Sequence, residues 1–171
     1  MNAIQIVAKQ LNMQTMLFRN TLRDIDDEGS FIRLSSNVNH LRWIAGHLVT
    51  IRYSVAVKLG MRDEPYPHIE KFSIKDAPPP GNRPIDEAVL YPDLKETLGF
   101  WDIYSVYLID AVSKLTEKQF NAEGDFLSPI GGNSVLETFA FVASHEAYHI
   151  GQMGFIRKSL GYEPMSYQMN F

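Results

Sequence analysis

The residues of this chain that could do chemistry are concentrated in one short segment, His145-Glu146-Ala147-Tyr148-His149. Residues four apart lie on one face of a helix, about one turn from each other. Two imidazoles at that spacing can bind the same metal ion, with Zn–N distances of roughly 2.0–2.1 Å. A third histidine, His47, lies far upstream and is the predicted third ligand.

The surroundings of this histidine pair are apolar, which favours a buried site. Residues 139–143 precede it, and Ile150, Met153, Phe155 and Ile156 follow it. A buried imidazole without a polar partner costs free energy, and a shared metal would satisfy both rings. The alternative is that two hydrogen-bonded core histidines have this spacing by chance, because the chain contains five histidines.

The same segment matches H-E-x-x-H, the zinc-protease motif in which the glutamate is the general base. The extended metzincin form needs a glycine at position 152 and a histidine at position 155, where this chain has Gln152 and Phe155. The only acidic residue after Glu146 is Glu163, which lies beyond the predicted helix. No strand pattern is present to hold an extended peptide. The zinc-protease interpretation is therefore disfavoured.

Composition narrows the class of protein. With 171 residues, 45% hydrophobic and 21% charged, we expect one soluble domain over residues 1–171. The net charge of −4 argues against nucleic acid as a partner, because nucleic-acid binders carry a basic surface. The chain has no cysteine, which excludes disulfides and thiolate ligands. Any reactive thiol would have to come from another molecule.

The sequence shows no sign of export or of a membrane span. Residues 1–6 lack the basic and long apolar regions of a signal peptide. No uncharged, mostly apolar stretch, residues 138–144 among them, is long enough to cross a bilayer. We therefore expect a cytoplasmic protein with no membrane partner.

Apolar residues recur every three or four positions in four segments, at about residues 3–24, 38–59, 92–115 and 134–160, which predicts four long helices. Asn37 or Asn39 is the expected cap of the second helix, and residues 134–137 form a capping-box signature for the last. The Pro-rich connection over residues 60–84 is typical of a lid or binding loop. The predicted fold class is all-α, a four-helix bundle with a long crossover connection between helices 2 and 3.

Helical spacing also predicts where the three histidines point. His47 lies three residues after Ile44 and four before Ile51, on the apolar face of its helix, so it should face the core. It lies about midway along the second helix, as His145 and His149 do along the last, so the three can meet across the bundle. Three neutral imidazoles leave coordination positions open, as in catalytic sites. A metal bound there would lower the pKa of a bound water or thiol.

Four other polar residues are not predicted ligands but have expected places in the fold. Gln152 follows His149 by three residues and borders the same face, so it is a candidate to contact a ligand or to support the site; Glu146 is the other candidate of this kind. His40 is expected at an interface or at the helix start, with a supporting role at the site as the alternative. His68 is expected to be exposed to solvent in the crossover.

The order of these motifs resembles the DinB/YfiT-like superfamily of small metal-binding four-helix proteins. The family pattern is a histidine on the second helix, here His47, and H-x-x-x-H-x-G-Q on the last helix, here residues 145–152. The resemblance covers nearly the whole chain. It implies that His47, His145 and His149 bind a divalent metal ion, commonly zinc or nickel, and that the protein forms a homodimer.

The resemblance implies less about the reaction. Some members are similar to thiol-dependent transferases that use bacillithiol, mycothiol or glutathione, and others are described as hydrolases. We predict a metal-dependent enzyme that activates a low-molecular-weight thiol, or water, for attack on a small-molecule electrophile. The alternatives are a non-catalytic metal- or ligand-binding stress-response module and a helical scaffold whose histidines hold no metal.

Overall fold

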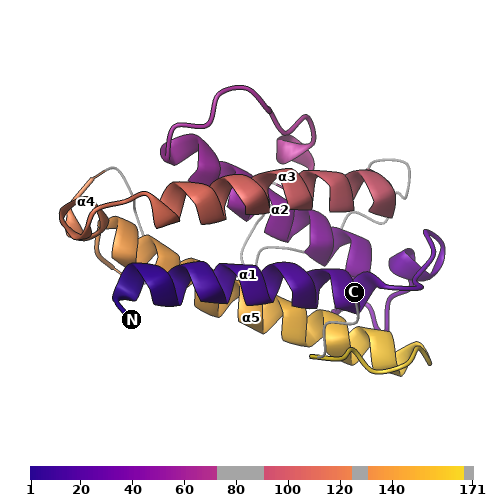
Figure 1. The fold of residues 1–171 in the computed structure, drawn as a ribbon. Helices are drawn as coiled ribbons and strands as arrows, with labels where there is room; N and C mark the ends of the chain where they lie inside the picture. The colour runs from indigo at the N-terminus through magenta and orange to yellow at the C-terminus, as the bar shows by residue number, and fades with distance from the viewer. Residues whose placement is uncertain (73–90, 125–130, 168–171) are drawn as a thin grey trace.

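The computed structural model describes residues 1–72, 91–124 and 131–167, and within them the fold is all-helical (Figure 1). One isolated antiparallel bridge, between Glu123 and Ser134, is the only strand-like pairing in these ranges. The predicted all-α bundle is confirmed. Its long helices are α1 (Ala3–Leu22), α2 (Leu41–Lys58), α3 (Leu94–Ser113) and α5 (Val135–Ser159), and its short elements are η1 (Gly29–Phe31), η2 (Ile69–Phe72) and α4 (Glu117–Asn121).

Side-chain caps define where the helices begin. The capping box predicted for the last helix is present: Glu137 N donates to Ser134 Oγ at 3.2 Å, and Ser134 N donates to Glu137 Oε2 at 3.1 Å. The second helix starts at Leu41 rather than at about residue 38. Its cap is His40, whose Nδ1 accepts from Trp43 N at 3.0 Å, and not Asn37 or Asn39 as predicted. The imidazole nitrogen here takes the place of the usual Asn or Asp oxygen.

Helices α2 and α5, which carry the three histidines, are neighbours in the bundle. In Figure 1, α1 lies in front between α3 and α5, with α2 behind them. Helix α1 packs on both α3 and α5, whereas α2 packs mainly on α3 and over a smaller interface on α5. The core contains large aromatic side chains, including the stacked rings of Phe18 and Trp101, whose centroids are 3.9 Å apart. No described helix is both long and apolar enough to cross a membrane.

The first part of the long connection after α2 packs against the bundle. The ring of Phe72, at the end of η2, is buried against Gly46 of α2. A Cβ atom at Gly46 would lie 2.0 Å from Phe72 Cζ, so the close approach needs a glycine at this position. Residues 73–84 of the predicted crossover lie outside the described residues. The described part of the connection, up to Phe72, therefore packs on α2 at Gly46, the residue before His47.

Candidate metal centre

The three predicted ligands lie together between α2 and α5. His145 Nε2 is 3.3 Å from His47 Nε2 and 3.2 Å from His149 Nε2. One potential ligand atom from each residue lies within 4.8 Å of the other two. Nitrogen atoms that share a metal at about 2.1 Å are roughly 3–3.5 Å apart in tetrahedral or octahedral geometry. The cluster therefore has the dimensions of a metal site.

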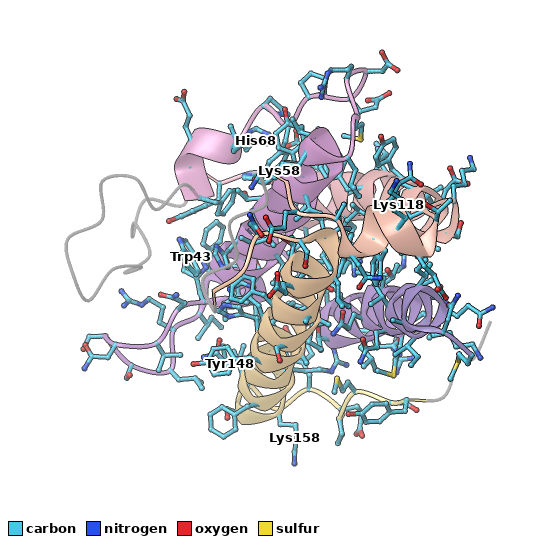
Figure 2. All side chains as sticks on the ribbon, turned by 90° about the vertical axis from the view of Figure 1, so that its left-hand side faces the viewer. Trp43, Lys58, His68, Lys118, Tyr148 and Lys158 are labelled. Atoms are coloured by element: carbon cyan, nitrogen blue, oxygen red, sulfur yellow. The ribbon has the colours of Figure 1, made fainter. Side chains whose placement is uncertain are left out.

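The cluster is buried on one side and partly open on the other. His47 is buried within α2, whereas His145 and His149 are half-buried on α5. Tyr148, between them in sequence, is 63% exposed and lies toward the same side of the bundle as Trp43 in Figure 2. His145 and His149 are therefore partly accessible to solvent, whereas His47 is not.

The nitrogens fit a cation better than they fit one another. A neutral imidazole has one N–H and one bare nitrogen. His145 Nε2 is within hydrogen-bonding distance of two other imidazole nitrogens. Because one ring nitrogen has a single hydrogen or a single in-plane lone pair, only one of these two contacts can be a well-aligned hydrogen bond. A cation between three bare Nε2 atoms would satisfy all of them.

The orientation of each ring is fixed by a different neighbour. His149 Nδ1 lies 2.8 Å from Gln152 Oε1, so Gln152 accepts a hydrogen bond when Nδ1 carries the proton and leaves Nε2 bare. The Nδ1 atoms of His47 and His145 are buried and have no hydrogen-bond partner within the described parts of the chain. Packing holds these two rings instead. Trp43 stacks on His47 with centroids 5.1 Å apart, and Phe141 lies 5.2 Å from His145.

All three rings are held in the neutral form that binds metals. Burial, and then the neighbouring imidazoles, lower the pKa of His47 to about 3. The same causes lower the pKa of His145 to about 4. Burial also lowers the pKa of His149, against the opposing effect of its bond with Gln152. No proton has to be displaced from these nitrogens at neutral pH before a metal ion binds.

These lowered pKa values predict that the metal-free protein loses stability in mild acid. Between pH 6.5, the usual pKa, and about 4, the unfolded chain binds protons at His47 and His145 that the folded chain does not. The free energy of unfolding should therefore fall as the pH decreases through this window. Urea denaturation of chelator-treated protein would measure the slope. His47→Gln removes one of the titrating groups and should make the slope shallower; an equal slope would contradict the prediction.

Comparison with known proteins agrees with this architecture. A sequence model of the DinB superfamily matches residues 10–153, a range that contains all three histidines. The chain belongs to the DinB superfamily. Among solved structures it is similar to a conserved protein from Enterococcus faecalis, with a TM-score of 0.72 and 13% identity over 94% of this chain and 98% of that one. This likeness shows the fold alone. No curated protein matches the sequence.

In this DinB-superfamily protein, the Glu146 carboxylate binds Arg52 and is not part of the three-histidine group. Glu146 Oε1 accepts from Arg52 Nε at 2.7 Å, and Oε2 accepts from Arg52 Nη2 at 2.8 Å, with both side chains fully buried. Successive residues of a helix point about 100° apart, so His145 and Glu146 face different neighbours. The pairing with Arg52 turns the Glu146 carboxylate away from direct ligand contact, and a supporting role for Glu146 at the site stays a prediction. Its carboxylate is also not placed as the zinc-protease base would be.

For three other residues the structure adds to or changes what the sequence predicts. Trp43 is buried like other core residues, and its ring also stacks on a ligand candidate. His68 was expected to be exposed, yet it is half-buried and its Nε2 lies 2.9 Å from Glu96 Oε1. The buried ion-pair role of Arg52 was not predicted from the sequence. The available signal was its place on an apolar helix face, four residues after Leu48 and three before Val55.

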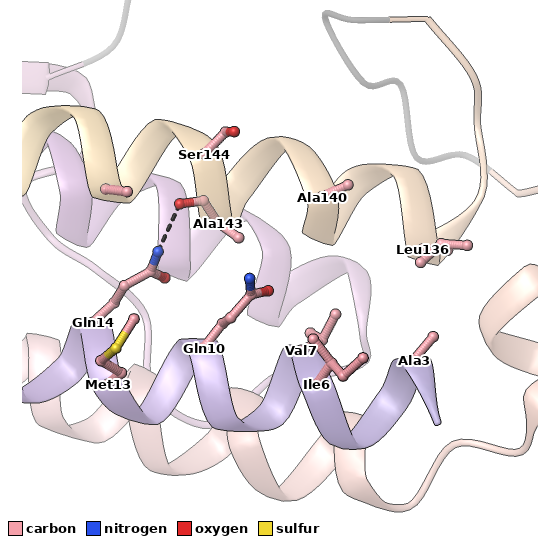
Figure 3. Close-up of a pocket in the computed structure, with 11 residues that line it drawn as sticks. Ala3, Ile6, Val7, Gln10, Met13, Gln14, Leu136, Ala140, Ala143 and Ser144 are labelled. Atoms are coloured by element: carbon pink, nitrogen blue, oxygen red, sulfur yellow. Dashed lines mark hydrogen bonds between the residues drawn. The ribbon is translucent and has the colours of Figure 1, made fainter. Parts of the chain in front are cut away.

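A separate groove of about 480 Å³ lies between α1 and α5 (Figure 3). Gln14 Nε2 donates across it to Ala143 O at 2.6 Å. None of the three clustered histidines lines it, so it is separate from the candidate metal centre. Its walls are mainly small or apolar and come from Ala3, Ile6, Val7, Gln10, Met13, Gln14, Leu136, Ala140, Ala143, Ser144 and Ala147.

Proposed function

We propose that this protein is a metal-dependent enzyme in which His47, His145 and His149 hold a divalent cation, zinc or nickel, and a low-molecular-weight thiol attacks a small electrophile. The observation that supports it most is the convergence of three neutral Nε2 atoms on a partly open point between α2 and α5. No acidic side chain joins them within the described residues. An anion bound there would be the first negative charge at the site.

The chemistry of the donor set favours a thiol over water. A cation with three neutral ligands keeps its full charge and lowers the pKa of a bound thiol or water. A free thiol has a pKa of about 8.5, so it needs much less lowering than water, at about 15.7, to be ionised at neutral pH. Glu146, the acidic residue nearest in sequence to the ligands, is already paired with Arg52 and is not free to accept a proton from water.

The thiol must be supplied by the surroundings, because the chain contains no cysteine. Low-molecular-weight thiols stay reduced in the cytoplasm. We therefore infer a cytoplasmic enzyme whose partners are a thiol and a small-molecule substrate, with neither nucleic acid nor a membrane involved.

Metal analysis followed by a conjugation assay would test the proposal. Protein purified without a histidine tag should contain zinc or nickel, or bind either one after chelation. With glutathione or bacillithiol and 1-chloro-2,4-dinitrobenzene, the thiol sulfur forms a bond to the ring carbon, chloride leaves and the thiol proton goes to solvent. The rate should depend on the metal and vanish with a chelator.

The other outcomes of this experiment are distinct. Metal binding with neither thiol conjugation nor hydrolysis would contradict the proposed enzymatic activity and favour a non-catalytic metal-binding module. A protein that binds neither metal would contradict both and leave a helical scaffold with a histidine cluster.

We also propose that the protein is a homodimer. Large apolar side chains are exposed on two helices that pack together, with Ile6 and Met13 on α1 and Phe155 on α5 between 42% and 67% exposed. Exposed apolar surface of this kind is typical of an interface. Sedimentation at micromolar concentration should give twice the chain mass of 19.5 kDa, and a species of 19.5 kDa would contradict the proposal.

A further inference from the structure

One buried ion pair joins the two helices that carry the histidines. Arg52 of α2 and Glu146 of α5 form two parallel hydrogen bonds, of 2.7 and 2.8 Å, and neither side chain has exposed area. A bidentate Arg–carboxylate pair fixes the orientation of its partners as well as their distance, because the guanidinium is a rigid planar fork. The pair therefore constrains how α5 can rotate relative to α2.

The guanidinium of Arg52 is itself held from several sides. Its Nη1 donates to Thr15 Oγ1 at 2.7 Å and to Ser105 Oγ, and its Nη2 also donates to Leu11 O at 3.2 Å. The Trp101 ring lies under it, with the centroid 3.6 Å from Cζ. With the two bonds to the glutamate, these partners account for all five N–H groups. Through these contacts, Arg52 of α2 links α5 to both α1 and α3.

This pair lies directly after a candidate ligand on α5 and about one and a half turns after another on α2. Glu146 directly follows His145, and Arg52 follows His47 by five residues on α2. Helix α5 is therefore fixed toward α2 on two adjacent faces, through a histidine and through a glutamate. Since the interface between α2 and α5 is smaller than the one between α1 and α5, the ion pair makes up a larger share of the contact between the two histidine-bearing helices.

A small rotation would be enough to disrupt the site. Side chains reach about 5–6 Å from a helix axis, so a rotation of about 10° moves their ends by about 1 Å. Metal–ligand distances tolerate only about 0.2 Å. We propose that Arg52 and Glu146 are positioning residues, whose ion pair sets the alignment of α2 and α5 that brings the three histidine nitrogens to one metal ion. This inference rests on the proposed metal centre.

Zinc affinity, measured by competition with a chromophoric chelator, tests the inference apart from any activity. Glu146→Gln and Arg52→Lys, which keep the size or the charge but lose the paired fork, should weaken zinc binding by about 10–100-fold, as loss of supporting contacts does at other metal sites. The deciding variant is Arg52→Met with Glu146→Leu. Apolar replacement of both partners of a buried pair is often neutral or stabilising.

A purely structural role and a positioning role predict different results for this double variant. If the pair only stabilises the fold, the double variant should regain both its melting temperature and its zinc affinity. If it positions the ligands, the fold should recover while zinc affinity stays at least about tenfold weak. Leu108→Ala, a buried substitution in α3, serves as the destabilised control and should keep the zinc affinity of the wild type.

Each result decides a separate question. Zinc binding by the double variant within about threefold of the wild type would overturn the positioning role and leave the metal centre intact. A wild-type protein that binds neither zinc nor nickel would overturn the metal centre itself. Glu146→Gln leaves an unpaired buried charge and can fail to fold, in which case the apolar double variant gives the answer.

Discussion

Replacing His149 by alanine should abolish metal-dependent activity and weaken metal binding by more than 100-fold, beyond the roughly 10–100-fold that loss of a supporting contact causes. An open site with three protein ligands cannot hold its metal well with two. The helical fold should survive, because His149 is half-buried and its neighbours on the core side of α5 are unchanged. Metal titration of the variant, with circular dichroism of both metal-free proteins, would measure the two effects.

Two matched variants sharpen this test. Gln152→Ala removes only the hydrogen bond to His149 Nδ1 and should weaken metal binding by about tenfold. His68→Ala removes a histidine outside the cluster and should change nothing at the site. A structural metal predicts a different pattern, in which coordination is closed and loss of a ligand mainly lowers stability. Unchanged activity in His149→Ala would remove the metal from the mechanism.

Gly46→Ala should lower the free energy of unfolding by about 1–3 kcal/mol, because the new methyl group overlaps the buried ring of Phe72. The gain in helix propensity, about 0.5–1 kcal/mol, opposes this effect and is smaller than most of its range. Phe72→Ala alone should cost about 3–5 kcal/mol through the cavity it leaves. Urea denaturation of both single variants gives these values.

The double variant, Gly46→Ala with Phe72→Ala, tests whether overlap with the Phe72 ring is the cause of the stability loss in Gly46→Ala. With alanine at position 72 the space beside Gly46 is empty, so adding Gly46→Ala there should be neutral or stabilising by about 0.5–1 kcal/mol. An equal cost of Gly46→Ala in both backgrounds would show that the contact with Phe72 is not the reason for the glycine.

Much of this architecture could be predicted from local patterns. The apolar periodicity gives the four helices, and the same period places His145 beside His149 and points His47 inward. These inferences succeed because each needs only the geometry of a single helix. The start of α2 was misplaced because Asn37 and Asn39 are stronger general caps than His40, whose imidazole caps this helix instead.

The parts that were missed depend on contacts between distant residues. Arg52 and Glu146 are 94 positions apart, and the sequence shows only that each carries a charge on a helix with many apolar residues. The motif H-E-x-x-H suggested a role for Glu146 near the metal, whereas the rotation of α5 in the bundle turns it to Arg52. The stacking of Trp43 on His47 likewise depends on ring orientations that spacing does not specify.

The separation of the ligands along the chain has a consequence for biosynthesis. His47 is 98 positions from His145, and the two later candidate ligands belong to α5, which is synthesised after α1, α2 and α3. A nascent chain that ends before residue 145 offers a metal ion one histidine of the cluster, and α1 still lacks α5, which it packs against in the finished bundle. Capture of a metal by the proposed centre would therefore have to follow synthesis of α5, so the metal available to the chain at that stage would determine which ion it takes up.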